Sequence, residues 1–236
     1  MSFEITNTIK TLRNEGCASF VNKLGQYFSH FKQAYSFLRD KTADPLAKSK
    51  HPFLGQQQKD SEIKQLYEIV AARQPRSVLE IGTAGGGTLF LWCQAAHPQA
   101  TIVSIDLPCG IHGGGYPKWK SLVYKKFKQP RQTLKLIRGN SHSHKALQEV
   151  VAYLPNIDLL FIDGGHRYMD VLSDFYHFLF LVRPGGMIVF HDIVPHTDQT
   201  CQVDKFWQEI KGQFKTQEIV EDWNQKTCGI GIIYKS

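Results

Sequence analysis

The sequence predicts an α/β domain built on a largely parallel β-sheet. After Pro75, short apolar runs alternate with helical patterns, which is the order of elements in βαβ units. One run, Ile157–Asp163, has four consecutive apolar residues and is typical of a strand buried on both faces. We therefore expect helices on both faces of the sheet, joined to the strands by right-handed crossovers.

Turn signals and periodicity divide the region after Pro75 into its elements. The expected strands are Ser77–Gly82, Thr101–Leu107, Thr133–Ile137, Ile157–Asp163 and Met187–His191. The expected helices between them are Thr88–Ala96, Trp119–Phe127, Lys145–Leu154 and Tyr168–Val182. The tail adds a helix at Val203–Lys211 and two strands, Thr216–Val220 and Gly229–Tyr234. Only a loop joins these last two strands, so we expect them to pair antiparallel.

The region before Pro75 has a different, helical rhythm. Apolar residues recur at helical spacing from Ile5 to about Asp40, and a further helix is expected at Ser61–Arg73. Between them, Thr42–Gln58 is interpreted as a polar connector broken by two X-Pro steps. The predicted organisation is an N-terminal helical extension over residues 1–74 and the α/β domain over residues 75–236. The aromatic residues of the extension are expected to pack as a cap or in a homo-oligomer contact.

Composition excludes several classes of protein. The 236 residues are 42% hydrophobic and carry a formal net charge of +7, which permits an anionic partner without requiring one. No apolar run is long enough to cross a membrane, and the N-terminus carries no apolar signal core. The five cysteines form no CxxC pair, which argues against a disulfide framework and for a reducing, cytoplasmic setting.

A glycine-rich turn follows the first strand and opens the first helix. The segment VLEIGTAGGG contains Glu80, Gly82, Thr83 and Gly85, and a strand, glycine-rich turn and helix in this order are typical of nucleotide binding. It matches neither G-x-G-x-x-G nor a phosphate-binding loop ending in G-K-[ST]. Asp106 ends the second strand, where a carboxylate can accept hydrogen bonds from both hydroxyls of a ribose. The alternative is that the glycines only turn the chain.

Polar residues also follow the third and fourth strands. Ser141 is a candidate for the edge of an adenine ring, although a helix N-cap at Ser141 or Ser143 explains the segment equally well. Asp163-Gly164-Gly165-His166 ends the fourth strand, where ligands bind in open parallel sheets. Here the alternative is that Asp163 caps the next helix and His166 lies on a solvated turn.

Together these segments resemble class I S-adenosylmethionine-dependent methyltransferases. Glu80 to Gly86 matches the first motif of that family with Ala84 in place of a glycine, and Asp106 matches its second-strand acid. FIDGGHRYMDVLSDF and LVRPGGMIVFHDI are similar to the branch that includes macrocin-type and cephalosporin-cluster O-methyltransferases. The resemblance covers about Ser77 to Ser236 and implies a Rossmann-like seven-stranded sheet of order 3-2-1-4-5-7-6, with the last strand antiparallel.

The resemblance also implies roles for individual residues. Glu80, Gly82, Thr83, Gly85, Asp106, Ser141 and Asp163 would bind S-adenosylmethionine. A divalent metal, magnesium or manganese, would be held by Asp163 and Asp192, with His191 in place of the first acid of a pair. The metal would lower the pKa of an acceptor hydroxyl as a Lewis acid, and His166 would be the general base.

The implied function is metal-assisted O-methylation of a small hydroxylated acceptor, such as a sugar or a glycosylated metabolite. A basic segment between Pro117 and Arg138 could receive an anionic acceptor, or it could be a solvated helix face. A nucleic-acid methyltransferase is disfavoured because no Asn/Asp-Pro-Pro-aromatic segment follows the fourth strand. A degenerate, non-catalytic binding protein of the same fold is the other alternative.

Overall fold

The computed structural model describes residues 44–108 and 115–236, together with the isolated positions 25, 29, 32 and 36. Residues Asp44–Ser236 form one compact unit. The amphipathic helices expected between Ile5 and about Asp40 therefore lie almost wholly outside the described residues. So does most of the glycine-rich loop after the second predicted strand.

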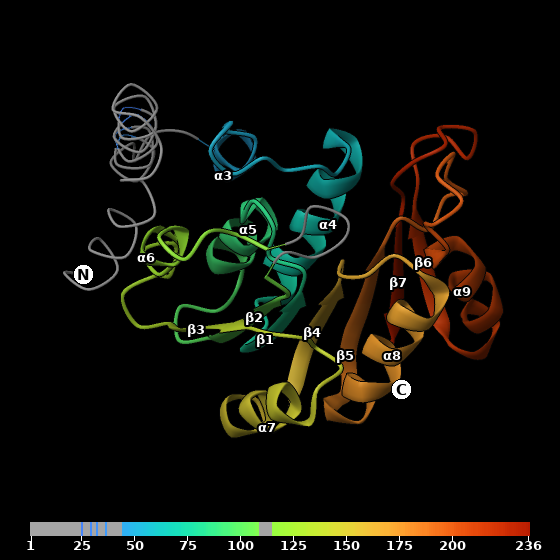
Figure 1. Cartoon of the computed structure of the whole chain (residues 1–236). Coiled ribbons are helices and arrows are strands. Elements are labelled where there is room, and N and C mark those ends of the chain that lie inside the picture. Colours follow the sequence, from blue (N-terminus) through green and yellow to red (C-terminus); the bar gives the residue numbers. More distant parts are fainter. Residues whose placement is uncertain (1–24, 26–28, 30–31, 33–35, 37–43, 109–114) are drawn as a thin grey trace, which may run out of the picture. The chain divides into compact units, whose positions relative to one another are not determined.

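The unit is a seven-stranded sheet with helices on both faces, and it confirms the predicted fold (Figure 1). The strands are β1 (Ser77–Ile81), β2 (Thr101–Asp106), β3 (Thr133–Arg138), β4 (Ile157–Ile162), β5 (Val182–His191), β6 (Lys215–Ile219) and β7 (Ile230–Tyr234). Their order is β3-β2-β1-β4-β5-β7-β6. All neighbours among β1 to β5 pair parallel, whereas β7 pairs antiparallel with both β5 and β6.

The helices follow the expected order. They are α3 (Pro45–Ser49), α4 (Asp60–Arg73), α5 (Gly87–Ala95), α6 (Lys120–Tyr124), α7 (His144–Tyr153), α8 (Tyr168–Phe178) and α9 (Val203–Ile210), with 3-10 turns at Leu179–Leu181 and Lys211–Gln213. Figure 1 shows α4 and α5 on one side of the sheet and α7 and α8 on the other. No helix among the described residues is long and apolar enough to span a membrane.

Successive side chains of the buried strands point to opposite faces of the sheet, so they pack in two separate cores. Leu160 and Ile162 of β4 belong to a cluster with Phe175 of α8 and Trp207 of α9. Phe161, between them in sequence, faces the other way, and its ring lies 5.1 Å from that of Trp92 of α5. Both faces of β4 are therefore buried from Leu159 to Ile162, which explains the unbroken apolar run there.

Several boundaries differ from those expected. Asp44-Pro45, interpreted as a break in the connector, instead begins α3: the Asp44 carboxylate caps the Ala47 N–H at 3.2 Å, and proline suits the first helical position. The helix expected at Tyr168–Val182 ends as α8 at Phe178 and continues only as a 3-10 turn, because the chain enters β5 at Val182. β5, expected at Met187–His191, therefore begins five residues earlier than predicted.

The carboxyl ends of the parallel strands meet at one edge of the sheet. Gly82, Asp106, Asp163 and His191 lie at or directly after the ends of β1, β2, β4 and β5. The register pairs Ile81 with both Ile105 and Ile162, so these ends are level with one another. The fold thus brings together the residues that carry the predicted chemistry.

Candidate active site

The glycine-rich turn between β1 and α5 packs against backbone on two sides. A Cβ at Gly82 would lie 1.8 Å from the carbonyl oxygen of Asp163, and one at Gly85 would lie 1.7 Å from that of Leu54. Gly82 also has a φ of 95°, which residues with a side chain rarely adopt. The turn is therefore fixed between the end of β4 and the segment before α4.

Tyr124 of α6 adds a third support to this turn. Its hydroxyl donates to the carbonyl oxygens of Ala84 at 3.0 Å and Gly85 at 2.7 Å. A Cβ at Gly86 would come within 2.8 Å of the Tyr124 ring. This role of Tyr124 is not visible in the sequence, because Tyr124 lies within a lysine-rich segment and no local pattern shows that its side chain is buried.

Glu80 lies beneath the turn and is fully buried. Its carboxyl group accepts hydrogen bonds from Thr88 at 2.7 Å and Ser104 at 2.5 Å, and Ser104 also contacts Thr83 at 2.6 Å. Burial raises the pKa of Glu80 to about 8, although these hydroxyls oppose the shift. Glu80 and the Thr83 side chain therefore link β1, β2 and α5 from within the protein.

Asp106 ends β2 directly beside the turn. Its two carboxylate oxygens accept one backbone N–H each, from Ala84 at 2.9 Å and Gly115 at 3.0 Å. Burial raises its pKa, whereas these backbone donors and Arg138 act in the opposite direction. Nearby, the buried hydroxyl of Tyr116 has no hydrogen-bond partner among the described residues. A carboxylate and an unsatisfied hydroxyl thus lie together at this edge.

The loop after β3 contains Ser141 and starts α7. Ser143, not Ser141, is the helix cap, because its hydroxyl accepts the Ala146 N–H at 3.2 Å. Ser141 is half-buried beyond the end of β3. Its neighbour His142 lies 3.1 Å from the fully buried Asp174 of α8, a contact that raises the pKa of His142.

Two carboxylates and two imidazoles gather where β4 and β5 end. His191 Nδ1 lies 3.2 Å from Asp163 Oδ1 and 3.3 Å from Asp192 Oδ1. His166 lies between the same two acids, with Nε2 3.7 Å from Asp163 Oδ1 and Nδ1 3.6 Å from Asp192 Oδ2. The structure therefore brings together all four residues to which the sequence assigned proton transfer or metal binding.

The charges of these four side chains shift one another's pKa values. Burial opposes ionisation of both acids, but the neighbouring His191 lowers the pKa of Asp163 and of Asp192 below the ordinary range. Burial alone would lower the pKa of His191, yet the two carboxylates raise it well above its usual value. The pKa of His166 is also raised, because Asp163 outweighs the effect of burial. The acids are thus anionic and stabilise positive charge on the imidazoles.

Three residues near this group, His196, Cys201 and Cys228, were not predicted from the sequence. His196 Nε2 lies 3.1 Å from Asp192 Oδ1, and the Cys228 N–H donates to the same oxygen at 3.1 Å. Among the described residues, two clusters have donor atoms within 4.8 Å of one another: His191, Asp192 and Cys228, and His166, Asp192 and Cys201. Asp163 is in neither cluster. The antiparallel pairing of β7 with β5 was the only signal that could have placed Cys228 here.

Asp163 has its own polar partner outside the clusters. Its Oδ2 accepts a hydrogen bond from Gln58 Nε2 at 2.8 Å. Gln58 belongs to the segment before α4, the segment that also covers Gly85 through Leu54. This stretch was interpreted as a connector, but it contributes directly to the site.

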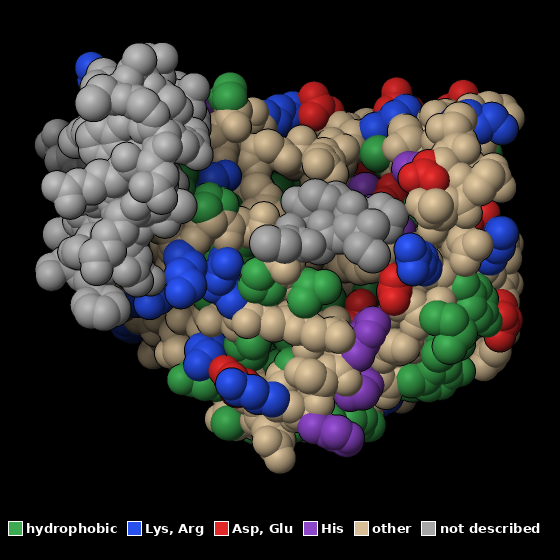
Figure 2. All heavy atoms as spheres, in the orientation of Figure 1, with side chains coloured by type: hydrophobic (Ala, Val, Ile, Leu, Met, Phe, Trp, Pro, Cys, Tyr) green, Lys and Arg blue, Asp and Glu red, His purple; other side chains and the backbone are tan. Residues whose placement is uncertain are grey.

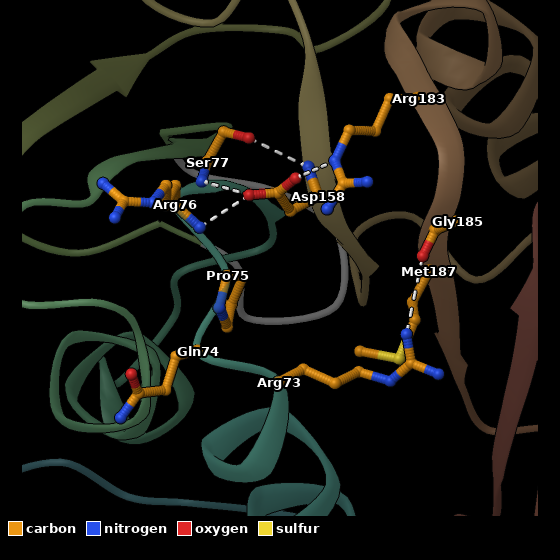
Figure 3. Close-up of a pocket in the computed structure, with 9 residues that line it drawn as sticks. All are labelled: Arg73, Gln74, Pro75, Arg76, Ser77, Asp158, Arg183, Gly185 and Met187. Carbon is orange, nitrogen blue, oxygen red and sulfur yellow. Dashed lines mark hydrogen bonds and ion pairs between the residues drawn. The ribbon is translucent and has the colours of Figure 1, made fainter.

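A cavity of about 380 Å³ lies at the opposite end of the sheet (Figure 3). Asp158 at the start of β4 occupies its wall, accepting the N–H groups of Arg76 at 2.6 Å and Ser77 at 3.0 Å and pairing with Arg183. Arg73 points away from this pair toward the Gly185 carbonyl (Figure 3). Asp158, the carboxylate of this cavity, is occupied by Arg183 and by backbone donors, so we interpret the cavity as a structural junction rather than the candidate site.

The basic segment predicted around α6 is a surface feature. Figure 2 shows Lys and Arg side chains gathered on the part of the molecule that carries this helix. Lys120 is an exception, since its ammonium group donates to the Phe53 carbonyl at 2.9 Å and lies 4.7 Å from the Phe53 ring centroid. Lys120 therefore anchors the segment that covers the glycine-rich turn.

Part of the chain is similar to known proteins. Residues 79–193 match a family described as a methyltransferase domain. Protein R132 of Acanthamoeba polyphaga mimivirus is 37% identical over 115 residues, which are 48% of this chain and 50% of R132. Protein y4gI of Sinorhizobium fredii is 30% identical over 147 residues, or 60% of this chain and 16% of y4gI. The chain thus spans half or less of these relatives.

Solved structures share the fold at low sequence identity. The O-methyltransferase TomG of Streptomyces achromogenes, in complex with SAM, has a TM-score of 0.55 at 19% identity, covering 86% of this chain and 94% of TomG. An O-methyltransferase of Bacillus cereus in complex with SAH has a TM-score of 0.58 at 16% identity, covering 86% and 96%. With the strand order, these likenesses show that the chain has the Rossmann-like methyltransferase fold.

Proposed function

We propose that this chain transfers the methyl group of S-adenosylmethionine to a hydroxyl of a small acceptor. The observation that carries the proposal is the position of Asp163 and His166 at the same sheet edge as Asp106 and the glycine-rich turn. That edge would hold a methyl donor on one side and a proton acceptor on the other. The SAM and SAH complexes of the similar O-methyltransferases support this choice of cofactor.

The residues at the turn fit the proposed cofactor. Each Asp106 oxygen accepts one backbone N–H and has capacity for a further hydrogen bond, which suits the two ribose hydroxyls. The unsatisfied Tyr116 hydroxyl provides an additional polar group nearby. Ser141 is the candidate for the adenine edge. Glu80 would act as a positioning residue, because Thr88 and Ser104 occupy its carboxyl group inside the fold.

The chemistry requires one proton acceptor and good alignment. When bound, S-adenosylmethionine supplies an activated methyl group, whose bond to sulfur breaks as the bond to the acceptor oxygen forms, the electron pair remaining on sulfur. His166 in its neutral form takes the hydroxyl proton, since it is 24% exposed and therefore accessible to an acceptor. Its raised pKa makes this imidazole a stronger base, and turnover requires a pH high enough to deprotonate it first. Asp163 and Asp192 orient its ring and stabilise the imidazolium that forms.

The donor set does not fit the magnesium ion implied by the resemblance. Magnesium prefers oxygen ligands in near-octahedral geometry. Here Asp163 Oδ1 contacts His191, its Oδ2 accepts from Gln58, and the described donor clusters around Asp192 contain imidazole and thiol groups. The proposed mechanism therefore contains no step that depends on magnesium.

The acceptor proposed is a sugar or a glycosylated metabolite. A hydroxyl of this kind has a high pKa, so it needs a base aligned with the methyl donor. The surface lysines around α6 would favour an acceptor that carries negative charge (Figure 2).

Calorimetric titration tests the cofactor assignment. We expect S-adenosylmethionine to bind the full chain, NAD not to bind, and Asp106→Asn to weaken S-adenosylmethionine binding at least tenfold, or about 1.4 kcal/mol. Asp60→Asn is the matched control, because Asp60 is an exposed carboxylate at the start of α4. Absence of S-adenosylmethionine binding to the wild-type chain would overturn the proposal.

A further inference from the structure

An acid, Asp174, occupies a core-facing position of α8. The buried residues of this helix are Val171, Asp174, Phe175 and Phe178, and Asp174 is fully buried. Neither of its carboxylate oxygens has a hydrogen-bond partner among the described residues. A carboxylate in such surroundings costs free energy, whereas an apolar side chain would extend the core. The presence of an acid at this position therefore requires an explanation.

The group that faces Asp174 is His142, in the loop after β3. His142 Nε2 lies 3.1 Å from Asp174 Oδ1, so the two side chains form an ion pair when the imidazole is protonated. Asp174 raises the pKa of His142, and a backbone hydrogen bond with Asp170 adds to this effect, whereas burial opposes it. His142 therefore contacts two successive turns of α8.

The loop that carries His142 is held in shape by its own polar groups. Asn140 Oδ1 accepts the His142 N–H at 2.9 Å, and the Asn140 carbonyl accepts the Ser143 hydroxyl at 2.8 Å. Ser143 in turn caps α7. Ser141, the candidate for the adenine edge, lies within this loop. The position of Ser141 therefore depends on where His142 is attached.

The same face of α8 supports the turn that follows β4. A Cβ at Gly164 would lie 3.2 Å from Asp174 Oδ2, and one at Gly165 would lie 2.7 Å from Asp170 Cβ. Asp170 and Asp174 are four residues apart, so they lie on the same side of the helix. Because Gly164 and Gly165 directly precede His166, α8 supports the backbone that leads to the proposed general base.

We propose that His142 and Asp174 are positioning residues, which hold the loop after β3 against the turn after β4 so that the two sides of the cofactor site keep a fixed separation. Both act on the cofactor through the backbone that they connect. A loop that is already in place before binding loses less conformational entropy when the cofactor binds, so the pair increases affinity. The inference rests on the proposed function, because it assumes that S-adenosylmethionine binds between these strand ends.

Calorimetric titration of S-adenosylmethionine into the full chain tests the pair by a double-mutant cycle. We expect His142→Ala and Asp174→Ala each to weaken binding about tenfold, and the double variant to weaken it by the same factor, because all three remove one connection. Asp174→Asn should restore the affinity to within about threefold of wild type, since asparagine can still accept a hydrogen bond from His142. His144→Ala, at an exposed histidine in the first turn of α7, is the matched control and should bind as wild type does.

Urea denaturation of the same variants separates positioning from a purely structural role. His142→Ala leaves the buried Asp174 carboxylate without its partner, which destabilises the fold, and the double variant removes that charge. We therefore expect the double variant to recover much of the stability lost in His142→Ala while its affinity for S-adenosylmethionine stays low. The double variant also keeps the test decisive if His142→Ala fails to fold.

Three results would overturn the positioning role alone: wild-type affinity in the double variant, affinity that follows stability across the variants, or equal losses of affinity in Asp174→Asn and Asp174→Ala. Each of these requires that the wild-type chain binds S-adenosylmethionine. Absence of binding to the wild-type chain would instead overturn the proposed function and this inference together.

Discussion

His166 is the residue on which the proposed chemistry depends most directly. Its ring contacts carboxylates at the ends of two strands, and its backbone carbonyl accepts the Gln202 N–H at 2.7 Å, so both ring and backbone are positioned. We expect His166→Ala to lower kcat about 10²- to 10⁴-fold, the usual contribution of a general base. The affinity for S-adenosylmethionine, measured by calorimetry, should change little.

The control for this variant is His144→Ala, which alters an exposed histidine at the start of α7. His144→Ala should retain the wild-type kcat. Full methyl-transfer rates in His166→Ala would show that another group takes the proton.

Gly85 must be a glycine because the backbone of another segment lies too close for a side chain. A Cβ there would lie 1.7 Å from the Leu54 carbonyl oxygen, a backbone atom that cannot rotate away. We expect Gly85→Ala to lower the free energy of unfolding by about 1 to 3 kcal/mol, as overpacking does. Urea denaturation measures this, and Gly212→Ala, which meets nothing within 4 Å, is the control. Equal stability of the two variants would contradict the prediction.

At the scale of elements, Asp158 joins the starts of three neighbouring strands. It precedes the buried part of β4, accepts backbone donors from β1 and the residue before it, and pairs with Arg183 of β5 (Figure 3). Ser77 Oγ in turn accepts the Asp158 N–H at 3.0 Å. Burial opposes its ionisation, but Arg183 and these donors hold the pKa of Asp158 below its usual value.

We expect Asp158→Asn to lower the free energy of unfolding by about 1.5 to 3 kcal/mol near neutral pH, since hydrogen bonds to a charged group are lost. The folded-state pKa is lowered, so this stabilisation is full above the unfolded pKa of about 3.9 and is lost progressively as the pH falls through the lower folded-state pKa. Chemical denaturation at pH 7 and pH 3 should therefore show a smaller difference between wild type and variant at pH 3 than at pH 7. A difference that is as large at pH 3 as at pH 7 would contradict this account.

The sequence was most informative where an element is determined by local pattern. β4 and its Asp163 were predicted because a buried strand has an unbroken apolar run and a polar end. His191 and Asp192 were expected beside Asp163 because the resemblance assigns the three residues to one metal site. The carboxyl ends of β4 and β5 do meet at one edge. The seven-stranded order required the family resemblance, since periodicity alone does not specify which strands are neighbours.

Contacts made by loops could not be predicted in this way. Cys228 reaches Asp192 only because β7 returns antiparallel to β5, and His196 reaches it from the loop after β5. Leu54 covers Gly85 from a segment that has no apolar periodicity. These residues are far apart in sequence, and their meeting depends on tertiary packing rather than on local propensity.

At the scale of the whole molecule, the two ends of the sheet serve different purposes. Charges at the amino ends of the strands are paired in a structural junction around Asp158. At the carboxyl ends, charged groups lie close together around Asp192. Among the described residues, one buried atom of this group, His191 Nε2, has no hydrogen-bond partner. The residues that stabilise the fold and the residues proposed for the chemistry therefore lie at opposite ends of the strands. A variant at one end should leave the properties of the other end unchanged.

Glu80 makes the stability of the whole domain depend on pH. Burial raises its folded-state pKa to about 8, whereas an unfolded glutamate titrates near 4.3. The raised value means that the contribution of Glu80 to stability is full below about pH 4.3 and is lost as the pH rises toward 8. Between these values the loss approaches, at most, about 1.4 kcal/mol for each pH unit.

Glu80→Gln removes this titration while keeping a side chain of the same shape that can still bond to Thr88 and Ser104. We expect the variant to be less stable than wild type, or equal to it, at pH 5 and to become the more stable of the two by pH 8.5. Urea denaturation at both pH values measures this change, with Asp60→Asn as the exposed-acid control. A constant difference between Glu80→Gln and wild type across this range would mean that Glu80 is already ionised in the folded protein at pH 5.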